Sequence, residues 1–192
     1  MEDDNRSAPT PTSRRPAIVG VAVIGALLMA GFAGTAMWLG SAKVSPAHVE
    51  PAAPPIYTAA FKDSAGKRIV LGEWQHKLLI INFWATWCAP CKEEMPLLSA
   101  LHAEYAARGV QIVGIAADSS LNVDNFAKNT AISYPLLPDE AGAIAFSRRL
   151  GNRLGLLPHT VVVAPGGQVV AVKLGPIIES DFRAVIEKHL PK

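Results

Sequence analysis

The chain has 192 residues but only two cysteines, Cys88 and Cys91, and its five histidines are scattered. Two cysteines exclude a small domain held together by several disulfides. A structural zinc site needs four ligands, and no second CxxC pair is present to supply them, so we expect no metal ion. Basic residues exceed acidic ones by only 18 to 16, without a basic block, which excludes the usual signature of a nucleic-acid partner.

Charge is absent from one long apolar run, Ile18–Leu39. This length is close to the roughly 20 residues that a membrane-spanning helix needs. Arg6, Arg14 and Arg15 precede the run, and only Lys43 follows it closely. Because basic residues favour the cytoplasmic side, the run predicts a single-pass transmembrane anchor with the rest of the chain outside the cytoplasm.

A cleaved signal peptide is the alternative for this run. Small residues that suit a cleavage site occur near Thr35-Ala36 and Ser41-Ala42. The apolar core of a signal peptide usually has about 7–15 residues, and this run is longer. The length therefore favours an uncleaved anchor.

Composition divides the rest of the chain into three parts. Residues 1–17 are polar and contain three prolines, which predicts a disordered cytoplasmic tail. Residues 40–55 contain four prolines among alanines, which favours an extended linker. Residues 56–192 have the length and apolar content of one folded domain.

Within this domain, apolar runs alternate with segments of helical periodicity, and turn residues separate them. The alternation predicts an α/β fold whose sheet is covered by helices on both faces. We expect strands at 56–61, 68–71, 78–84, 110–117, 160–163 and 168–174, and helices at 90–108, 122–129, 141–150 and from residue 180 onward.

The two cysteines lie between a continuous apolar strand and a predicted helix. The positive end of a helix lowers the pKa of a cysteine, and the thiolate is the reactive form. We expect Cys88, just before the helix, to be the exposed attacking sulfur. Cys91, one turn into the helix, would be shielded and would resolve a mixed disulfide by attacking Cys88. Pro90 suits the first helical turn, where its missing N–H is not needed.

Other uses of a CxxC pair fit less well. Covalent haem attachment needs a histidine after the second cysteine, and this chain has Lys92 there. An inert structural disulfide would close so short a loop that it would add little stability.

The segment Phe83–Pro96 resembles the active-site segment of the membrane-anchored TlpA/ResA branch of the thioredoxin-like (redoxin) family. A second landmark, Leu157-Pro158-His159-Thr160, resembles the cis-proline segment of that family. The resemblance covers about Ile56–Lys192 and implies a thioredoxin-like fold with a central mixed sheet. It also implies a cis peptide bond before Pro158, which would offer the backbone of Leu157 to a substrate strand beside Cys88. The alternative is a proline that merely begins an edge strand.

Two further positions follow the same resemblance. Asn82 occupies the strand position where thioredoxin usually has a buried aspartate, and a neutral amide cannot accept a proton. Glu94 matches an acidic residue that this branch has close to the dithiol, so it would handle the proton of Cys91. The alternative for Glu94 is an ordinary first-turn acid that interacts favourably with the helix dipole.

The remaining candidate residues surround the dithiol. We expect Trp87, Ala89 and Pro90 to form the substrate-binding surface together with the cis-proline segment, and Trp84 to pack in the core. His159 would be either a solvent-exposed strand residue or a group that tunes the dithiol. Client specificity in this fold lies in loops near the dithiol, here Asp118–Asn125 and Leu150–Leu157.

Taken together, these features predict a membrane-tethered thiol-disulfide oxidoreductase on the periplasmic side of a bacterial cytoplasmic membrane. The resemblance implies a reductant of client disulfides, in cytochrome c maturation or in assembly of oxidase copper sites. It also implies that an integral-membrane thiol transporter donates the electrons. We expect no cofactor. The alternatives are an oxidant or isomerase, a redoxin-type peroxidase, and a non-enzymatic copper-delivery module.

Overall fold

The computed structural model describes residues 56–191. The tail, anchor and linker expected over 1–17, 18–39 and 40–55 lie outside the described residues. Within 56–191, no helix has both the length and the apolar character needed to cross a membrane.

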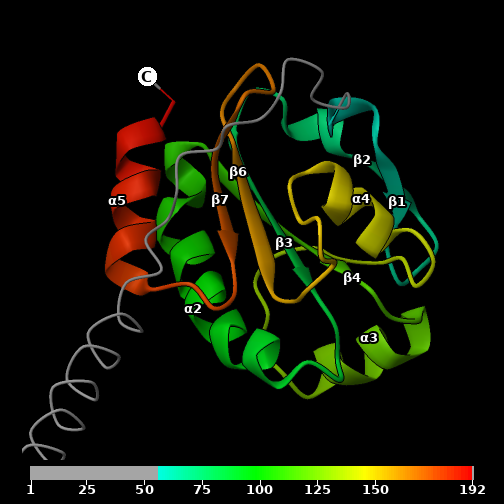
Figure 1. The fold of residues 1–192 in the computed structure, drawn as a ribbon. Helices are drawn as coiled ribbons and strands as arrows, with labels where there is room; N and C mark the ends of the chain where they lie inside the picture. The colour runs from blue at the N-terminus through cyan, green and yellow to red at the C-terminus, as the bar shows by residue number, and fades with distance from the viewer. Residues whose placement is uncertain (1–55, 192) are drawn as a thin grey trace, which may run out of the picture. The chain divides into compact units, whose positions relative to one another are not determined.

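A five-stranded mixed sheet forms the centre of the domain, in the order β5-β4-β3-β6-β7, and β1 and β2 pair separately (Figure 1). The strands are β1 (Ala60–Lys62), β2 (Arg68–Val70), β3 (Leu78–Trp84), β4 (Val110–Ala116), β5 (Leu136–Pro138), β6 (His159–Val163) and β7 (Val169–Leu174). The α-helices are α2 (Ala89–Tyr105), α3 (Ser120–Lys128), α4 (Ala143–Arg149) and α5 (Glu179–His189), with 3₁₀ turns at Ile56–Thr58, Leu71–Trp74 and Ala106–Arg108.

Strand β3 lies in the middle of the sheet and leads directly to the dithiol. All seven of its residues are buried, as a strand covered on both faces requires. It runs parallel to β4 and antiparallel to β6, so Phe83 pairs with His159 and Trp84 pairs with Ala116. The carboxyl end of β3 therefore lies beside the amino end of β6, which brings the two predicted landmarks to the same end of the sheet.

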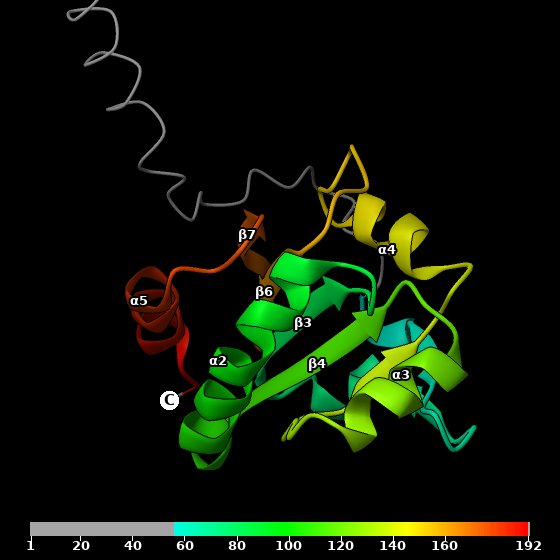
Figure 2. The same cartoon turned by 90° about the horizontal axis from the view of Figure 1, so that it is seen from below.

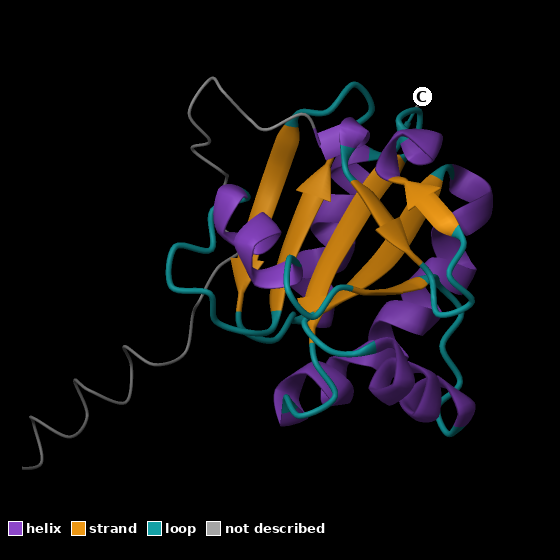
Figure 3. Ribbon diagram, turned by 90° about the vertical axis from the view of Figure 1, so that its right-hand side faces the viewer, coloured by secondary structure: helices purple, strands orange, loops and turns teal. Residues whose placement is uncertain are grey.

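Two apolar clusters fill the two faces of the sheet. The first packs α2, α5 and Val123 of α3 on one face, where side chains such as Ile80 and Trp84 point. The second packs α4 and the β1–β2 hairpin on the other face, where Ile81 and Phe83 point. Figure 2 shows α2 and α5 together along the sheet, and Figure 3 shows the strands in orange between the purple helices. The predicted mixed sheet with helices on both faces is confirmed.

The sequence-based expectations were wrong in two places. The strand expected from residue 56 begins at Ala60, because Ile56–Thr58 forms a 3₁₀ turn. Strand β5 was not expected: it has three residues and ends in a proline, and its contribution to the sheet comes from parallel pairing with β4 at the edge. The helix expected at 90–108 ends as an α-helix at Tyr105 and continues as the 3₁₀ turn Ala106–Arg108. The remaining boundaries agree to within about two residues, the usual spread at element ends.

Candidate active site

Cys88 and Cys91 form a disulfide at the first turn of α2, with their Cα atoms 5.3 Å apart. Cys88 is the N-cap residue in an extended conformation, and the N–H of Cys91 donates to its Sγ at 3.3 Å. Pro90 lies in the first turn, where no partner for an N–H is needed. Cys88 is 6% exposed and Cys91 is fully buried, so both cysteines are buried in the disulfide form. The expectation that Cys88 is exposed is therefore wrong for the disulfide form, in which Cys88 is only slightly more exposed than Cys91.

Asp118, at the end of β4, fixes the loop that precedes the dithiol. One carboxylate oxygen accepts hydrogen bonds from the backbone N–H of Thr86 at 3.0 Å and from its hydroxyl. The other accepts from the N–H of Ser119 and from the side-chain amide of Asn122, at 2.9 and 2.7 Å. Burial acts to raise the pKa of Asp118, but these hydrogen bonds outweigh it and lower the pKa below its ordinary value. Sequence reasoning did not identify this link, because Asp118 and Thr86 lie far apart in the chain.

Glu94 lies on α2, three residues after Cys91, and is only 5% exposed. The side-chain amide of Asn82 donates to one of its oxygens at 2.8 Å, and the N–H of Ile177 donates to the other at 3.0 Å. The same amide of Asn82 also donates to the hydroxyl of Thr160 at 3.0 Å. Glu94 is therefore a buried, hydrogen-bonded group and not a solvated acid at a helix end.

Burial raises the pKa of Glu94 from 4.5 to about 7. The hydrogen bonds from Ile177 and Asn82 and the charge of Lys173 act in the opposite direction but do not cancel the effect of burial. A carboxyl group with a pKa close to neutrality can both accept and release a proton under ordinary conditions. Asn82 on the strand thus holds, through its side-chain amide, a carboxyl group on the helix whose pKa lies near neutrality.

The Leu157–Pro158 peptide bond is cis, which confirms the expectation drawn from the sequence landmark. Pro158 is buried, and β6 begins at the next residue. Leu157 packs against both apolar clusters, the first of which contains Cys88 and Cys91. The cis-proline segment therefore lies at the end of the sheet that carries the dithiol.

The other predicted residues of the site differ in exposure. Trp87 is 70% exposed beside Cys88, whereas Trp84 is fully buried in the core, as expected. Ala89 is exposed and Pro90 is half-buried. Trp87 and Ala89 can thus contact a partner directly, which is compatible with the substrate-binding role predicted for them.

His159 corrects one expectation, because it is fully buried and not a solvent-exposed strand residue. Its ring stacks on Phe83 with centroids 5.5 Å apart, and its Nδ1 lies 2.9 Å from the hydroxyl oxygen of Ser147. Both contacts lie on the face of the sheet covered by α4, opposite the face that carries Glu94. Burial lowers the pKa of His159 to about 4. The sequence did not reveal this role, because it depends on the register between β3 and β6.

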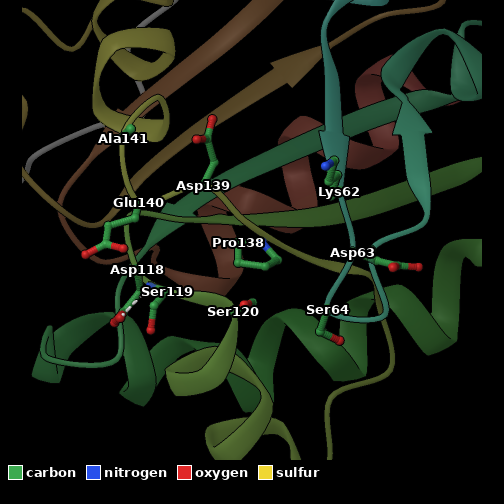
Figure 4. Close-up of a pocket in the computed structure, with 11 residues that line it drawn as sticks. Lys62, Asp63, Ser64, Asp118, Ser119, Ser120, Pro138, Asp139, Glu140 and Ala141 are labelled. Carbon is green, nitrogen blue, oxygen red and sulfur yellow. Dashed lines mark hydrogen bonds between the residues drawn. The ribbon is translucent and has the colours of Figure 1, made fainter.

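A surface pocket of about 460 Å³ lies next to Asp118 (Figure 4). Loops after β4 and β5 and the turn between β1 and β2 line it, and it contains the carboxylates Asp63, Asp139 and Glu140. Within residues 56–191, however, no group of three or more histidine, cysteine, aspartate or glutamate side chains is arranged to hold a metal ion.

A disulfide at a helix start, a cis-proline at the same end of the sheet and a buried carboxyl group three residues after the second cysteine are the features of a thioredoxin-like domain of the thiol-disulfide oxidoreductase class. The chain belongs to the Redoxin family, whose sequence profile matches residues 49–186.

Relatives of established name agree with this class. The thiol-disulfide oxidoreductase ResA of Bacillus subtilis (strain 168) is 33% identical over 120 residues, which cover 62% of this chain and 65% of that protein. ResA of Bacillus cereus is 31% identical over 130 residues, or 67% of this chain and 73% of that protein. The crystal structure of a thioredoxin-related protein from Neisseria meningitidis serogroup B superposes with a TM-score of 0.61 and 33% identity, covering 68% of this chain and 98% of that one.

Proposed function

We propose that this protein is a membrane-tethered, extracytoplasmic thiol-disulfide oxidoreductase that reduces disulfides in client proteins. The observation that carries the proposal is the dithiol itself: Cys88 caps α2, and Cys91 is buried one turn further on, close to Glu94. The names of the ResA relatives support the reaction class.

In the proposed reaction, the Cys88 thiolate attacks one sulfur of the client disulfide and releases the other client sulfur as a thiolate. Cys91 then gives up its proton to Glu94 and attacks the Cys88 sulfur of the mixed disulfide. The second client thiolate leaves, so two electrons have passed from the protein to the client. The raised pKa of Glu94, about 7, suits a group that must accept this proton near neutral pH.

The proposed location rests on the apolar run Ile18–Leu39 and on the arginines that precede it. Outside the cytoplasm the environment is oxidising, so a working dithiol needs a supply of electrons, which we propose comes from an integral-membrane thiol transporter. A tether raises the effective concentration of the domain near donor and client. We propose clients of the type found in cytochrome c maturation or in oxidase copper-site assembly, with exposed cysteine pairs.

The reduction potential of the Cys88–Cys91 pair tests the direction of electron flow. The purified protein is equilibrated in glutathione buffers, and the fraction of disulfide is measured by thiol alkylation. A reduction potential of about −270 mV or lower supports a reductant, whereas a reduction potential of about −120 mV would make the protein an oxidant.

The structure weighs against the copper-delivery alternative. A copper site at the dithiol would gain from a nearby histidine ligand, but the imidazole of His159 lies on the opposite face of the sheet, against Phe83 and Ser147. Copper titration of the reduced protein, with the thiols counted before and after, would test this alternative directly.

A further inference from the structure

Within residues 56–191, every large apolar side chain that is exposed lies near the end of the sheet that carries the dithiol. The register explains this arrangement, because Phe83, His159 and Leu174 are paired across β3, β6 and β7 at that end. The end of β4 lies there too, because Ala116 pairs with Trp84. Leu174 is the last residue of β7, and the other exposed residues lie a few positions from the ends of β3, β4, β6 or β7: Trp87, Leu121, Leu154, Leu156 and Ile178.

Two of these side chains belong to one short loop, residues 152–156, that runs into the cis-proline segment. Leu154 is 71% exposed and Leu156 is 53% exposed. The next residue, Leu157, packs against the apolar cluster that contains Cys88. The loop is therefore continuous with the proposed substrate-binding site, and its leucines are not needed to fill the core.

The loop is held in one conformation by Asn152, which is only 1% exposed. The side-chain amide of Asn152 donates to the carbonyl of Leu156 at 2.7 Å, and its carbonyl oxygen accepts from the N–H of Leu156 at 3.1 Å. These two bonds close the loop from one end to the other. The same amide also donates to the hydroxyl oxygen of Ser147 at 2.9 Å, which ties the loop to α4.

Two further contacts fix the loop to the domain. Ser147 also hydrogen-bonds the ring of His159 at 2.9 Å, so α4, the loop and β6 share one buried polar cluster. Gly155 has a φ of +69°, and a Cβ placed there would lie 3.0 Å from Ile144 and 3.1 Å from Arg148. The backbone of the loop thus lies against α4 while the leucines on either side of Gly155 point into solvent.

We propose that residues 152–156 form a client-recognition loop, preformed by Asn152, which binds an apolar side chain next to the disulfide cysteine of a polypeptide client. This inference rests on the proposed reduction of client disulfides and specifies the substrate. A preordered loop loses little conformational entropy on binding, and burial of its leucines stabilises only complexes with apolar clients. Asn152 is a positioning residue, since it acts through the leucines.

The test uses single-turnover exchange between the pre-reduced protein and two synthetic disulfide peptides. The peptides have equal charge and differ only at the residues flanking one cysteine, which are leucine in one and glutamine in the other. The reaction is followed by tryptophan fluorescence, and a second-order rate constant is obtained for each peptide. We expect the unaltered protein to prefer the leucine peptide and the double variant L154S/L156S to reduce that preference by about tenfold per leucine.

Leu121→Ser is the matched control, because Leu121 is 67% exposed at the same end of the sheet but lies on α3. It should keep the preference of the unaltered protein. Asn152→Ala should lose the preference for the leucine peptide even though both leucines are present. If Asn152→Ala does not fold, the double variant L154S/L156S still tests the proposal.

The outcomes separate the two proposals. If the unaltered protein exchanges with neither peptide, the proposed function itself fails. If it exchanges with both at equal rates, or if the double variant keeps the preference, the recognition loop is refuted and the oxidoreductase proposal stands. An equal loss of preference in Leu121→Ser would refute a specific loop in favour of a general apolar surface.

Discussion

Replacing Glu94 by glutamine should change how the stability of the protein depends on pH. Glu94 has an ordinary pKa of 4.5 in the unfolded chain, and burial raises the pKa to about 7 in the folded protein. Each pKa unit corresponds to about 1.4 kcal/mol, so the difference amounts to about 3 kcal/mol. This is the free energy that burial of the ionised form costs the folded state.

The sign follows from which state binds the proton. Below about pH 4.5 the carboxyl group is protonated in both states, and its contribution to stability is fully present. As the pH rises from about 4.5 through about 7, the unfolded chain releases the proton first while folded Glu94 retains it. The free energy of unfolding therefore falls across this window and becomes level above it.

The assay is urea denaturation of the oxidised protein at several pH values between about 4 and 8, for the unaltered chain and for Glu94→Gln. A glutamine offers a single acceptor to the two donors, Asn82 and Ile177, which lowers stability by about 1–3 kcal/mol at every pH. The free energy of unfolding of the variant, relative to the unaltered chain, should therefore rise by about 3 kcal/mol between about pH 4 and about pH 8, in addition to this pH-independent loss.

Glu93→Gln is the matched control, because Glu93 is the exposed neighbour on the same helix and the substitution removes the same charge. It should leave the pH dependence of the unaltered protein in place. If the curves for Glu94→Gln and the unaltered protein run parallel within about 1 kcal/mol, Glu94 does not titrate in this window. The proposed acceptance of the Cys91 proton would then lose its physical basis.

Four other variants test the rest of the site and the surface. Cys91→Ser should accumulate a mixed disulfide between Cys88 and a client, visible on non-reducing gels, whereas Cys88→Ser should trap none; the reverse pattern would exchange the proposed roles. Asp118→Ala should lower the free energy of unfolding by about 2–3 kcal/mol, measured with urea, because it leaves the partly buried N–H of Thr86 without its acceptor. A loss below about 0.5 kcal/mol would contradict this. Arg183→Met should leave the urea midpoint almost unchanged, and even less affected at high salt, since its ion pairs are partly exposed. A loss of stability as large as that of Asp118→Ala would be inconsistent with surface pairs.

Much of the fold was predictable because its signals are local. A buried strand such as β3 is apolar at almost every position, and a helix such as α2 has a regular apolar period. Strand β5 lacked such a signal, because three residues ending in proline gain their structure from the neighbouring strand. The start of the domain was misassigned for a similar reason, since a single 3₁₀ turn and a short strand have similar composition.

The sequence by itself determined the dithiol and its place at a helix start, whereas the cis-proline landmark came from the resemblance to a known family. Each of these is a short pattern that acts through its immediate neighbours: Cys88 caps the helix that contains Cys91, and Pro90 fits its first turn. The resemblance of the same segment to a known family added the acidic residue Glu94 as a candidate.

Only the tertiary structure decided the surroundings that control these residues. The donor from Ile177 reaches Glu94 across 83 positions of sequence, and Asp118 reaches Thr86 across 32. His159 is turned away from the dithiol by the register of β6 against β3. Burial and hydrogen bonding depend on which distant segments pack together, and these two properties set the pKa of Glu94 and the conformation of the loop before the cysteines.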